Sequence, residues 1–119
     1  MPITSFKDLI VWKKAMLLAE QSYKISAELP KTEMFGLVSQ IKRSAISIPS
    51  NIAEGHKRGR KDYIRFLKVA YGSSAELETQ LLLSQKLFPT IDTSKTIDLV
   101  IEAEKMISTI INKLTSENE

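Results

Sequence analysis

Basic side chains gather in one stretch of this 119-residue chain, and such side chains can hold an anionic ligand by charge. Residues 42–68 contain eight lysines and arginines but only two acidic residues, a net charge of +6, whereas the rest of the chain has a net charge of −3. A charge concentrated in this way favours a local site for an anionic partner. A solvated loop with its flanks is the competing interpretation. The candidate residues for contacting nucleic-acid phosphates are Lys42, Arg43, His56, Lys57, Arg58, Arg60, Lys61, Arg65 and Lys68.

The sequence lacks the residue patterns that catalysis or metal binding requires. It has no cysteine and a single histidine, His56, so thiolate ligands are excluded and nucleophilic catalysis has one base at most. A di-iron bundle needs Glu-x-x-His on two helices, and that motif is absent. Glu54 and Glu76 are carboxylates that could meet across helices, but hydrogen bonding or pairing with Arg43 is the more ordinary role. We therefore expect no enzyme, no metal and no cofactor.

Four helical segments are expected to position the basic residues, because apolar residues recur at steps of three and four in each. The expected helices span about residues 7–28, 33–56, 61–88 and 94–115. Short loops between long helices indicate antiparallel neighbours. The fold class is therefore predicted to be all-α, an antiparallel up-down-up-down four-helix bundle that forms one domain over residues 1–119.

The first expected helix begins with a capping pattern, in which Ser5 is the N-cap and Asp8 follows three residues later. Leu29-Pro30 ends it, because the residue before a proline is disfavoured in a helix. A second apolar line of this helix, which includes Leu18 and Ile25, is broken at Ser22. The line expected to form the bundle seam consists of Leu9, Trp12, Met16, Ala19 and Tyr23.

The second expected helix contains Pro49, which removes one backbone hydrogen bond. Either this helix continues through a kink, or it breaks into two helices at Ile48. The kink is favoured, because the apolar steps keep their phase through the proline. Gly55 and Gly59 are then expected to stop the helix and to form the turn.

A row of small polar residues lies beside the apolar face of the second expected helix, and a similar row follows the third. Such residues inside helices usually have hydrogen-bond partners, so we expect a network that fixes the pairing of these two helices or a contact between subunits. Ordinary surface polarity is the alternative. The residues of the expected network are Gln40, Ser47, Asn51, Glu54, Ser73, Glu76 and Gln80.

Composition and charge place the chain among water-soluble globular proteins, with 43% hydrophobic and 26% charged residues. No basic segment followed by an apolar run opens the sequence, and charges interrupt every apolar stretch before the roughly 18 residues that a membrane span needs. We therefore expect a cytoplasmic protein without a membrane partner.

Three segments carry a family resemblance: FKDLIVWKKA, then FGLVSQIKRSAISIPSNIAEGHKRG, then YIRFLKVAYGSSAELETQL. Together they span roughly residues 6–88 and resemble the bacterial four-helix-bundle proteins called 23S ribosomal RNA intervening-sequence proteins. The fourth helix matches by its pattern alone. The resemblance implies an antiparallel bundle that assembles as a ring-like homopentamer and has no established enzymatic activity. A related branch, the accessory proteins of diversity-generating retroelements, uses a basic surface with nucleic acid and a reverse transcriptase.

Two functions are expected from these observations. The first is a non-enzymatic homo-oligomer whose basic surface binds the backbone of RNA or DNA. The alternative is a scaffold that docks another protein and has no role with nucleic acid. The two apolar lines of the fourth expected helix mean either a broad internal face or a contact with a neighbouring subunit.

Overall fold

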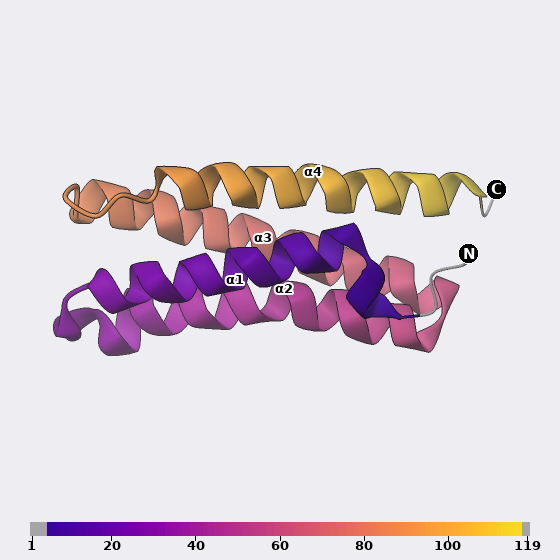
Figure 1. Cartoon of the computed structure of the whole chain (residues 1–119), viewed down its shortest axis with the longest axis horizontal. Coiled ribbons are helices and arrows are strands. Elements are labelled where there is room, and N and C mark those ends of the chain that lie inside the picture. Colours follow the sequence, from indigo (N-terminus) through magenta and orange to yellow (C-terminus); the bar gives the residue numbers. More distant parts are fainter. Residues whose placement is uncertain (1–4, 118–119) are drawn as a thin grey trace.

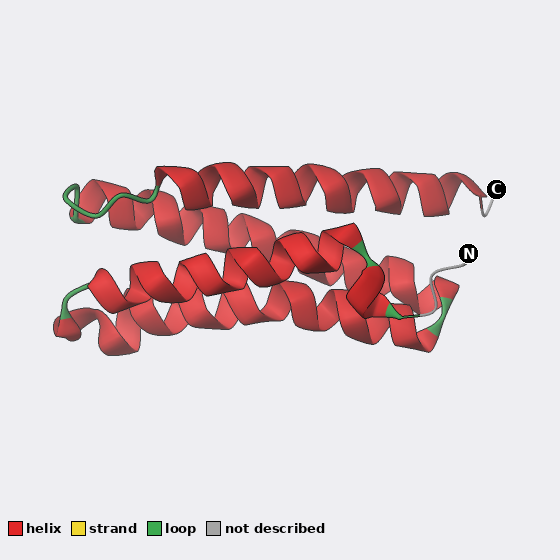
Figure 2. Ribbon diagram, in the orientation of Figure 1, coloured by secondary structure: helices red, strands yellow, loops and turns green. Residues whose placement is uncertain are grey.

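Four α-helices form most of the computed structural model, which describes residues 5–117. They are α1 (Ile10–Glu28), α2 (Ser39–Arg58), α3 (Arg60–Leu87) and α4 (Ser94–Glu117), and this part of the chain contains no β-strand. Consecutive helices lie side by side in an elongated body of 47 × 23 × 22 Å, and short loops join them (Figures 1 and 2). Among the neighbouring helices, the pair α2–α3 packs most extensively and the pair α1–α4 least. None of the helices within residues 5–117 is long and apolar enough to cross a membrane.

The two ends of this body differ in the segments that they bring together. The loop between α1 and α2 and the loop between α3 and α4 lie at the left-hand end in Figure 1, which we call the loop end (residues 29–38 and 88–93). The junction of α2 and α3 lies at the right-hand end with the end of α4, and we call this the turn end (residues 56–65 and 114–117). Most of the basic cluster predicted from the sequence therefore lies at the turn end.

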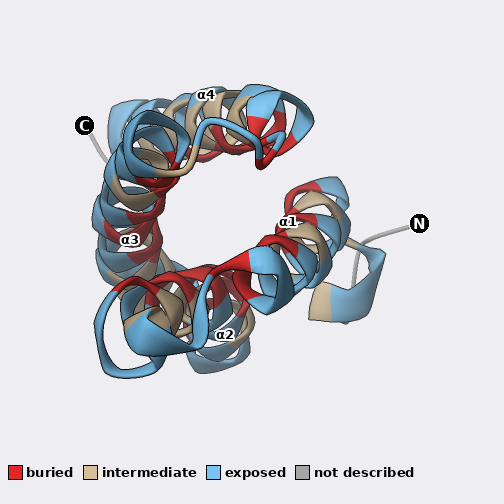
Figure 3. Cartoon of the chain, turned by 90° about the vertical axis from the view of Figure 1, so that its left-hand side faces the viewer, coloured by how far each residue is buried: buried red, intermediate tan, exposed pale blue. Residues whose placement is uncertain are grey.

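Apolar residues on the inward side of every helix form one core, and Figure 3 shows the buried residues facing the centre of the bundle. Each isoleucine or leucine that is removed from water there stabilises the fold by about 1.5–3 kcal/mol. The large side chains that are completely buried are Leu18, Ile41, Ile48, Ile52, Leu67, Leu77, Leu81, Val100 and Ile107.

Helix α1 begins at Ile10, so the start that we predicted at residue 7 is wrong. Ser5 instead caps a separate 3₁₀ turn, Phe6–Asp8, by accepting a hydrogen bond from the Lys7 amide at 3.1 Å. Leu9 is extended and separates this turn from α1. The Phe6 ring packs edge-on against Trp12, with 5.3 Å between the ring centroids, and this contact holds the turn against the helix.

The buried side of α1 is the line that contains Leu18 and Ile25, not the predicted seam. Met16 and Tyr23 of that seam are 38% and 39% exposed. Ser22, which we took as a break in the second line, is completely buried. Its hydroxyl donates a hydrogen bond to the Leu18 carbonyl at 2.8 Å, so a polar side chain is accommodated inside the core.

Helix α2 begins at Ser39, six residues later than the predicted start at 33. A 3₁₀ turn, Lys31–Glu33, and a π-helical turn, Met34–Val38, precede it. Gly36 lies inside the π-helical turn with non-helical angles (φ −110°, ψ −110°), so regular α-helix starts only after it. Phe35 beside it is 93% exposed.

Helix α2 runs through Pro49 without interruption, which agrees with a continuous helix and not with a break at Ile48. It also runs through Gly55, so this glycine does not stop the helix, which ends two residues beyond the predicted limit at 56. The helix ends at Arg58, and Gly59, with φ +109°, makes the whole connection to α3. Gly55 has another role, because a Cβ atom there would lie only 2.6 Å from the Cβ of Phe66. The backbones of α2 and α3 approach each other closely at this glycine.

Helices α3 and α4 end within two residues of their predicted limits, and a distant contact extends α4. The Arg60 guanidinium donates to the Glu117 carboxylate at 2.7 Å and to the Leu114 carbonyl at 3.4 Å. A basic side chain that binds the last carbonyls of a helix stabilises that end, so α4 continues to Glu117. At the other end of α4, Asp92 accepts hydrogen bonds from the Ser94 amide and hydroxyl, which lower the pKa of its carboxyl.

Two carboxyl groups meet between α3 and α4. Partial burial, a hydrogen bond that the protonated Glu104 donates to the Glu78 carboxylate, and repulsion by the charge of Glu78 together raise the pKa of Glu104 from 4.5 to about 7. The folded state therefore binds one more proton than the unfolded state between these two pH values.

The first prediction concerns the contact at Gly55. Gly55→Ala should destabilise the protein by about 1–3 kcal/mol, because its methyl group overlaps α3. Gly72→Ala is the matched control: a Cβ there meets nothing within 4 Å, and the change should stabilise the helix by up to about 1 kcal/mol. Urea unfolding followed by circular dichroism measures both. Equal effects of the two changes would contradict the close approach of α2 and α3.

The second prediction concerns Glu104. Because the pKa of this acid is raised on folding, its contribution lowers the free energy of unfolding as pH rises from about 4.5 through 7. Glu104→Gln should make the protein more stable at pH 8 and weaken the pH dependence between 5 and 8. Asp98→Asn, an exposed carboxylate on the same helix, is the control. Thermal unfolding of both variants between pH 5 and 8 measures these effects. An unaltered pH dependence of stability in Glu104→Gln would refute the raised pKa of Glu104.

Candidate nucleic-acid interface

The structure divides the predicted basic residues into two groups. His56, Lys57, Arg58, Arg60, Lys61, Arg65 and Lys68 surround the turn end or lie within two turns of it on α3. Lys42 and Arg43 lie near the start of α2, and about 20 Å of helix separates them from Lys57. The Lys42 ammonium lies 5.0 Å from the centre of the Tyr23 ring, whereas Arg43 donates to Gln40 at 2.6 Å. These two residues therefore do not belong to one patch with the others.

Gly59 explains why the basic residues of two helices lie together. Its positive φ lets α3 start directly after α2, so the last turn of one helix and the first turn of the other are adjacent. His56, Lys57 and Arg58 occupy the last turn of α2, where positive charge interacts favourably with the helix dipole. Asp62 provides a negative charge in the first turn of α3.

The arginines of the cluster are engaged with neighbouring acidic groups. Arg58 contacts the Glu54 carboxylate at 2.9 Å and the Asp62 carboxylate at 3.9 Å. Arg65 contacts Asp62 from the other side, at 3.6 Å. Arg60 is paired with Glu117 at the end of α4. Each exposed pair contributes at most about 1 kcal/mol, but together they fix the guanidinium groups in place.

Aromatic rings lie beneath these arginines. The guanidinium carbons of Arg58 and Arg65 lie 5.1 and 4.6 Å from the centre of the Phe66 ring. His56 meets Tyr63 edge-on, with 5.5 Å between ring centroids, and burial raises the pKa of Tyr63. Tyr63 and Phe66 are both half-buried.

The lysines of the cluster differ from the arginines. Lys57, Lys61 and Lys68 are exposed, and none has an ion pair with a residue in the described part of the chain. Lys61 and Lys68 are seven residues apart on one face of α3, about 10 Å along the helix axis. These ammonium groups lie at the turn end or, for Lys68, one turn beyond it on α3, and they remain available to an anion.

The predicted polar residues of α2 and α3 meet in separate contacts instead of one network. The hydroxyls of Ser47 and Ser73 lie 2.7 Å apart, and the Asn51 amide donates to the Ser47 hydroxyl at 2.9 Å and to the Ser47 carbonyl at 2.7 Å. Ser44, which is buried, donates to the Gln80 carbonyl oxygen at 2.7 Å. These contacts join α2 and α3 along their middle turns.

The two carboxylates considered as a catalytic pair do not meet. Glu54 pairs with Arg58, and Glu76 lies 3.9 Å from Arg43. Among residues 5–117, no three His, Cys, Asp or Glu side chains are grouped as metal ligands.

Several residues that contribute to the site were not predicted from the sequence. Glu117 is 57 positions from Arg60, so no local pattern predicted their contact. Asp62 was counted only for its charge, although its position four residues after Arg58 and three before Arg65 could have indicated a shared ion pair. Ser44, which contacts Gln80, was not among the predicted residues.

The comparisons with known proteins agree on one family. A family model described as 23S rRNA-intervening sequence protein matches residues 7–112, which includes most of α4. A crystal structure of a protein with unknown function from the S23 ribosomal protein family of Bacteroides thetaiotaomicron is similar, with a TM-score of 0.75 and 27% sequence identity. The match covers 86% of this chain and 98% of that one. No curated protein matches the sequence. The chain, matched over nearly its whole length, belongs to the 23S rRNA-intervening sequence protein family.

Proposed function

We propose that this protein is a non-enzymatic, homo-oligomeric bundle that binds the phosphate backbone of nucleic acid at its turn end. Its helices run antiparallel in an up-down-up-down order. The positions of the loops support this topology, because connections one and three lie at the loop end and connection two at the turn end (Figure 1).

The observation that supports the binding function is that the arginines of the cluster are ion-paired whereas its lysines are not. Arg58, Arg60 and Arg65 neutralise acidic neighbours and hold the helix ends. The neighbouring Lys57, Lys61 and Lys68 carry charge that no acidic residue in the described part of the chain offsets at ion-pair distance. Ammonium groups bind phosphates as point charges without reading bases. Binding of this kind is independent of sequence and strongly dependent on salt.

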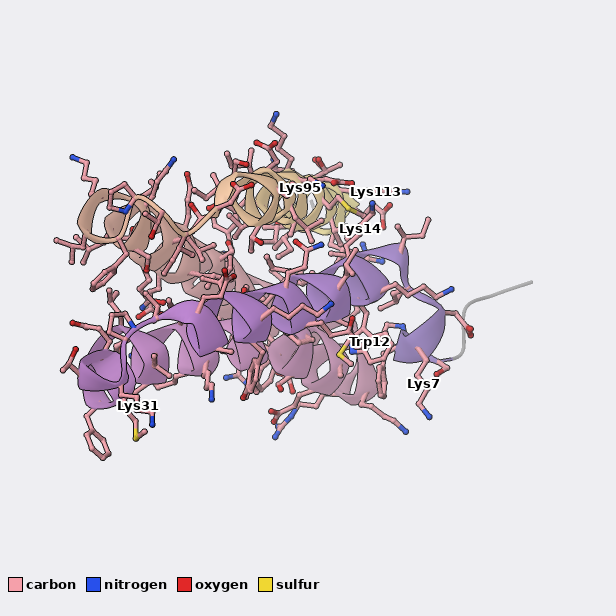
Figure 4. All side chains as sticks on the ribbon, turned by 60° about the vertical axis from the view of Figure 1, so that its left-hand side comes forward. Lys7, Trp12, Lys14, Lys31, Lys95 and Lys113 are labelled. Carbon is pink, nitrogen blue, oxygen red and sulfur yellow. The ribbon has the colours of Figure 1, made fainter. Side chains whose placement is uncertain are left out.

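An exposed apolar surface on α1 and α2 supports assembly into an oligomer. Met16, Tyr23 and Ile46 are each more than a third exposed. A groove of about 380 Å³ beside them is lined by Phe6, Trp12, Met16, Ala19, Ile46, Pro49, Ser50 and Ala53. Figure 4 shows Trp12 near the same end of the bundle as Lys7. A contiguous apolar surface of this kind favours contact with another protein surface. A second copy of the chain is the proposed occupant, and the family resemblance favours five copies.

An oligomer would bring several turn ends together. The lysines of neighbouring subunits would then act on the same polyanion, and affinity would rise with the number of phosphates contacted. The proposal assigns no reaction to the bundle, since its histidine packs against Tyr63 and its candidate carboxylates lie beside arginines.

The third prediction tests binding at the turn end. Lys57→Gln, Lys61→Gln and Lys68→Gln together should weaken binding of a fluorescent 20-nucleotide RNA or DNA. They should also lower the slope of log K against log salt by about 2–3, because each phosphate contact contributes roughly 0.7–0.9. The matched control combines Lys31→Gln, Lys86→Gln and Lys95→Gln, which remove the same charge at or near the loop end. Fluorescence anisotropy measures both. Equal loss in the two triple variants would contradict a site at the turn end.

The fourth prediction tests assembly. Light scattering on the purified protein should give a multiple of the 13.4 kDa chain mass, with five copies expected. Met16→Glu with Ile46→Glu should shift this mass toward one chain, because two charges cannot be buried in an apolar contact without large cost. Leu83→Glu, at an exposed position on α3, is the control. A monomeric parent protein would refute the oligomer, and dissociation by Leu83→Glu alone would refute the α1–α2 surface as its interface.

A further inference from the structure

A groove runs along the outside of the bundle between α3 and α4. Its first hollow, of about 420 Å³, lies nearer the turn end and is lined by Lys61, Asp62, Ile64, Arg65, Lys68 and Thr115. A second hollow, of about 330 Å³, is lined by Tyr71, Ile101, Glu104, Lys105, Ser108 and Thr109. Lys68 and Tyr71, three residues apart, are neighbours on the surface of α3, so the hollows follow each other along the helix. We call these two hollows the α3–α4 groove.

The α3 side of this groove places cations and an aromatic ring in a line. From Lys61 to Tyr71 the helix rises about 15 Å, with Lys68 between them. The α4 side contributes the hydroxyl groups of Ser108, Thr109 and Thr115. A positively charged groove with an aromatic ring for a base is the arrangement that proteins use to bind single strands.

We propose that the α3–α4 groove binds single-stranded nucleic acid, with phosphates at Lys61 and Lys68 and one base stacked on the ring of Tyr71. This inference rests on the proposed function and adds the strand type and the path of the strand. A single strand is favoured over a duplex, because stacking on a side chain needs a base whose face is free.

Tyr71 is the ring near the basic cluster whose face is available. Phe66 lies under two guanidinium groups, and Tyr63 packs against His56. Tyr71 is 45% exposed, and in residues 5–117 neither a cation nor another aromatic ring packs against it. Phe35 is more exposed, but it lies at the loop end, away from the unpaired lysines.

Acidic residues limit how far along the groove the phosphate backbone of the strand can make contact. Asp62 lines the first hollow, but Arg58 and Arg65 both contact its carboxylate. Glu104 lines the second hollow and meets Glu78 across α3 and α4. These two carboxyls are not offset by an ion pair with another residue of the described chain, so they disfavour a further phosphate. The contact with the backbone therefore ends close to Tyr71.

The fifth prediction tests the groove with fluorescent 12-nucleotide oligouridylate and an RNA duplex of the same length. The single strand should bind at least fivefold more tightly than the duplex. Tyr71→Ala should weaken binding of the single strand about 5- to 150-fold, the range expected for loss of one stacked base, and leave the salt slope unchanged. Tyr71→Phe should retain binding, because it keeps the ring. Phe35→Ala removes an exposed aromatic ring at the loop end, outside both the groove and the α1–α2 surface, and should have no effect.

The lysines of the groove are tested separately, by the salt dependence of binding. Lys61→Gln with Lys68→Gln should lower the salt slope for the single strand by about 1.4, the value for two phosphate contacts. Thermal unfolding of each variant shows whether the fold is retained. Tighter binding of the duplex, or parental affinity in Tyr71→Ala, would contradict the α3–α4 groove as the binding site of a single strand. The proposed binding at the turn end would still stand. Failure of the parent protein to bind any nucleic acid would instead overturn the proposed function itself.

Discussion

The close approach of α2 and α3 at Gly55 is the constraint on which the rest of the structure depends. A side chain at this position would collide with Phe66, and only glycine lets the two helices lie this near to each other. Gly59, four residues later, then turns the chain within a single residue. The Ser47–Ser73 and Ser44–Gln80 contacts continue the pairing toward the loop end. This pairing brings the end of α2 against the start of α3 and so creates the basic cluster.

The basic cluster separates its residues by role. Guanidinium groups have several donors in a fixed plane, so they suit contacts with carboxylates, backbone carbonyls and aromatic rings at once. Arg58, Arg60 and Arg65 make such contacts and connect α2, α3 and α4. Ammonium groups on flexible side chains remain exposed beside them. The same cluster can therefore stabilise the helix ends and still present charge to a polyanion.

Much of the fold follows from local rules in the sequence. Pro30 predicts where the first helix ends, and apolar steps of three and four predict the helices themselves. The errors occurred where a distant or unusual contact decides the structure. Ser22 was taken as a break because its hydroxyl bond to the preceding turn cannot be read from polarity alone. Because of the π-helical turn at Met34–Val38, α2 begins later than predicted, and the spacing of apolar residues does not reveal such a turn.

The candidate site was predictable in composition but not in arrangement. Charge counting located the cluster, yet it could not show that arginines are paired while Lys57, Lys61 and Lys68 have no acidic partner within residues 5–117. The α3–α4 groove brings together lining residues of α3 and α4 that are 30 or more positions apart in the sequence. Local patterns do not contain that information.

The most direct test of the central claim is ultraviolet crosslinking of the purified protein to RNA, followed by mass spectrometry of the crosslinked peptides. The account predicts crosslinks within residues 57–71 of α2 and α3 and near the end of α4. Crosslinks confined to residues 29–38 or 88–93 at the loop end, or a complete lack of crosslinks, would contradict it.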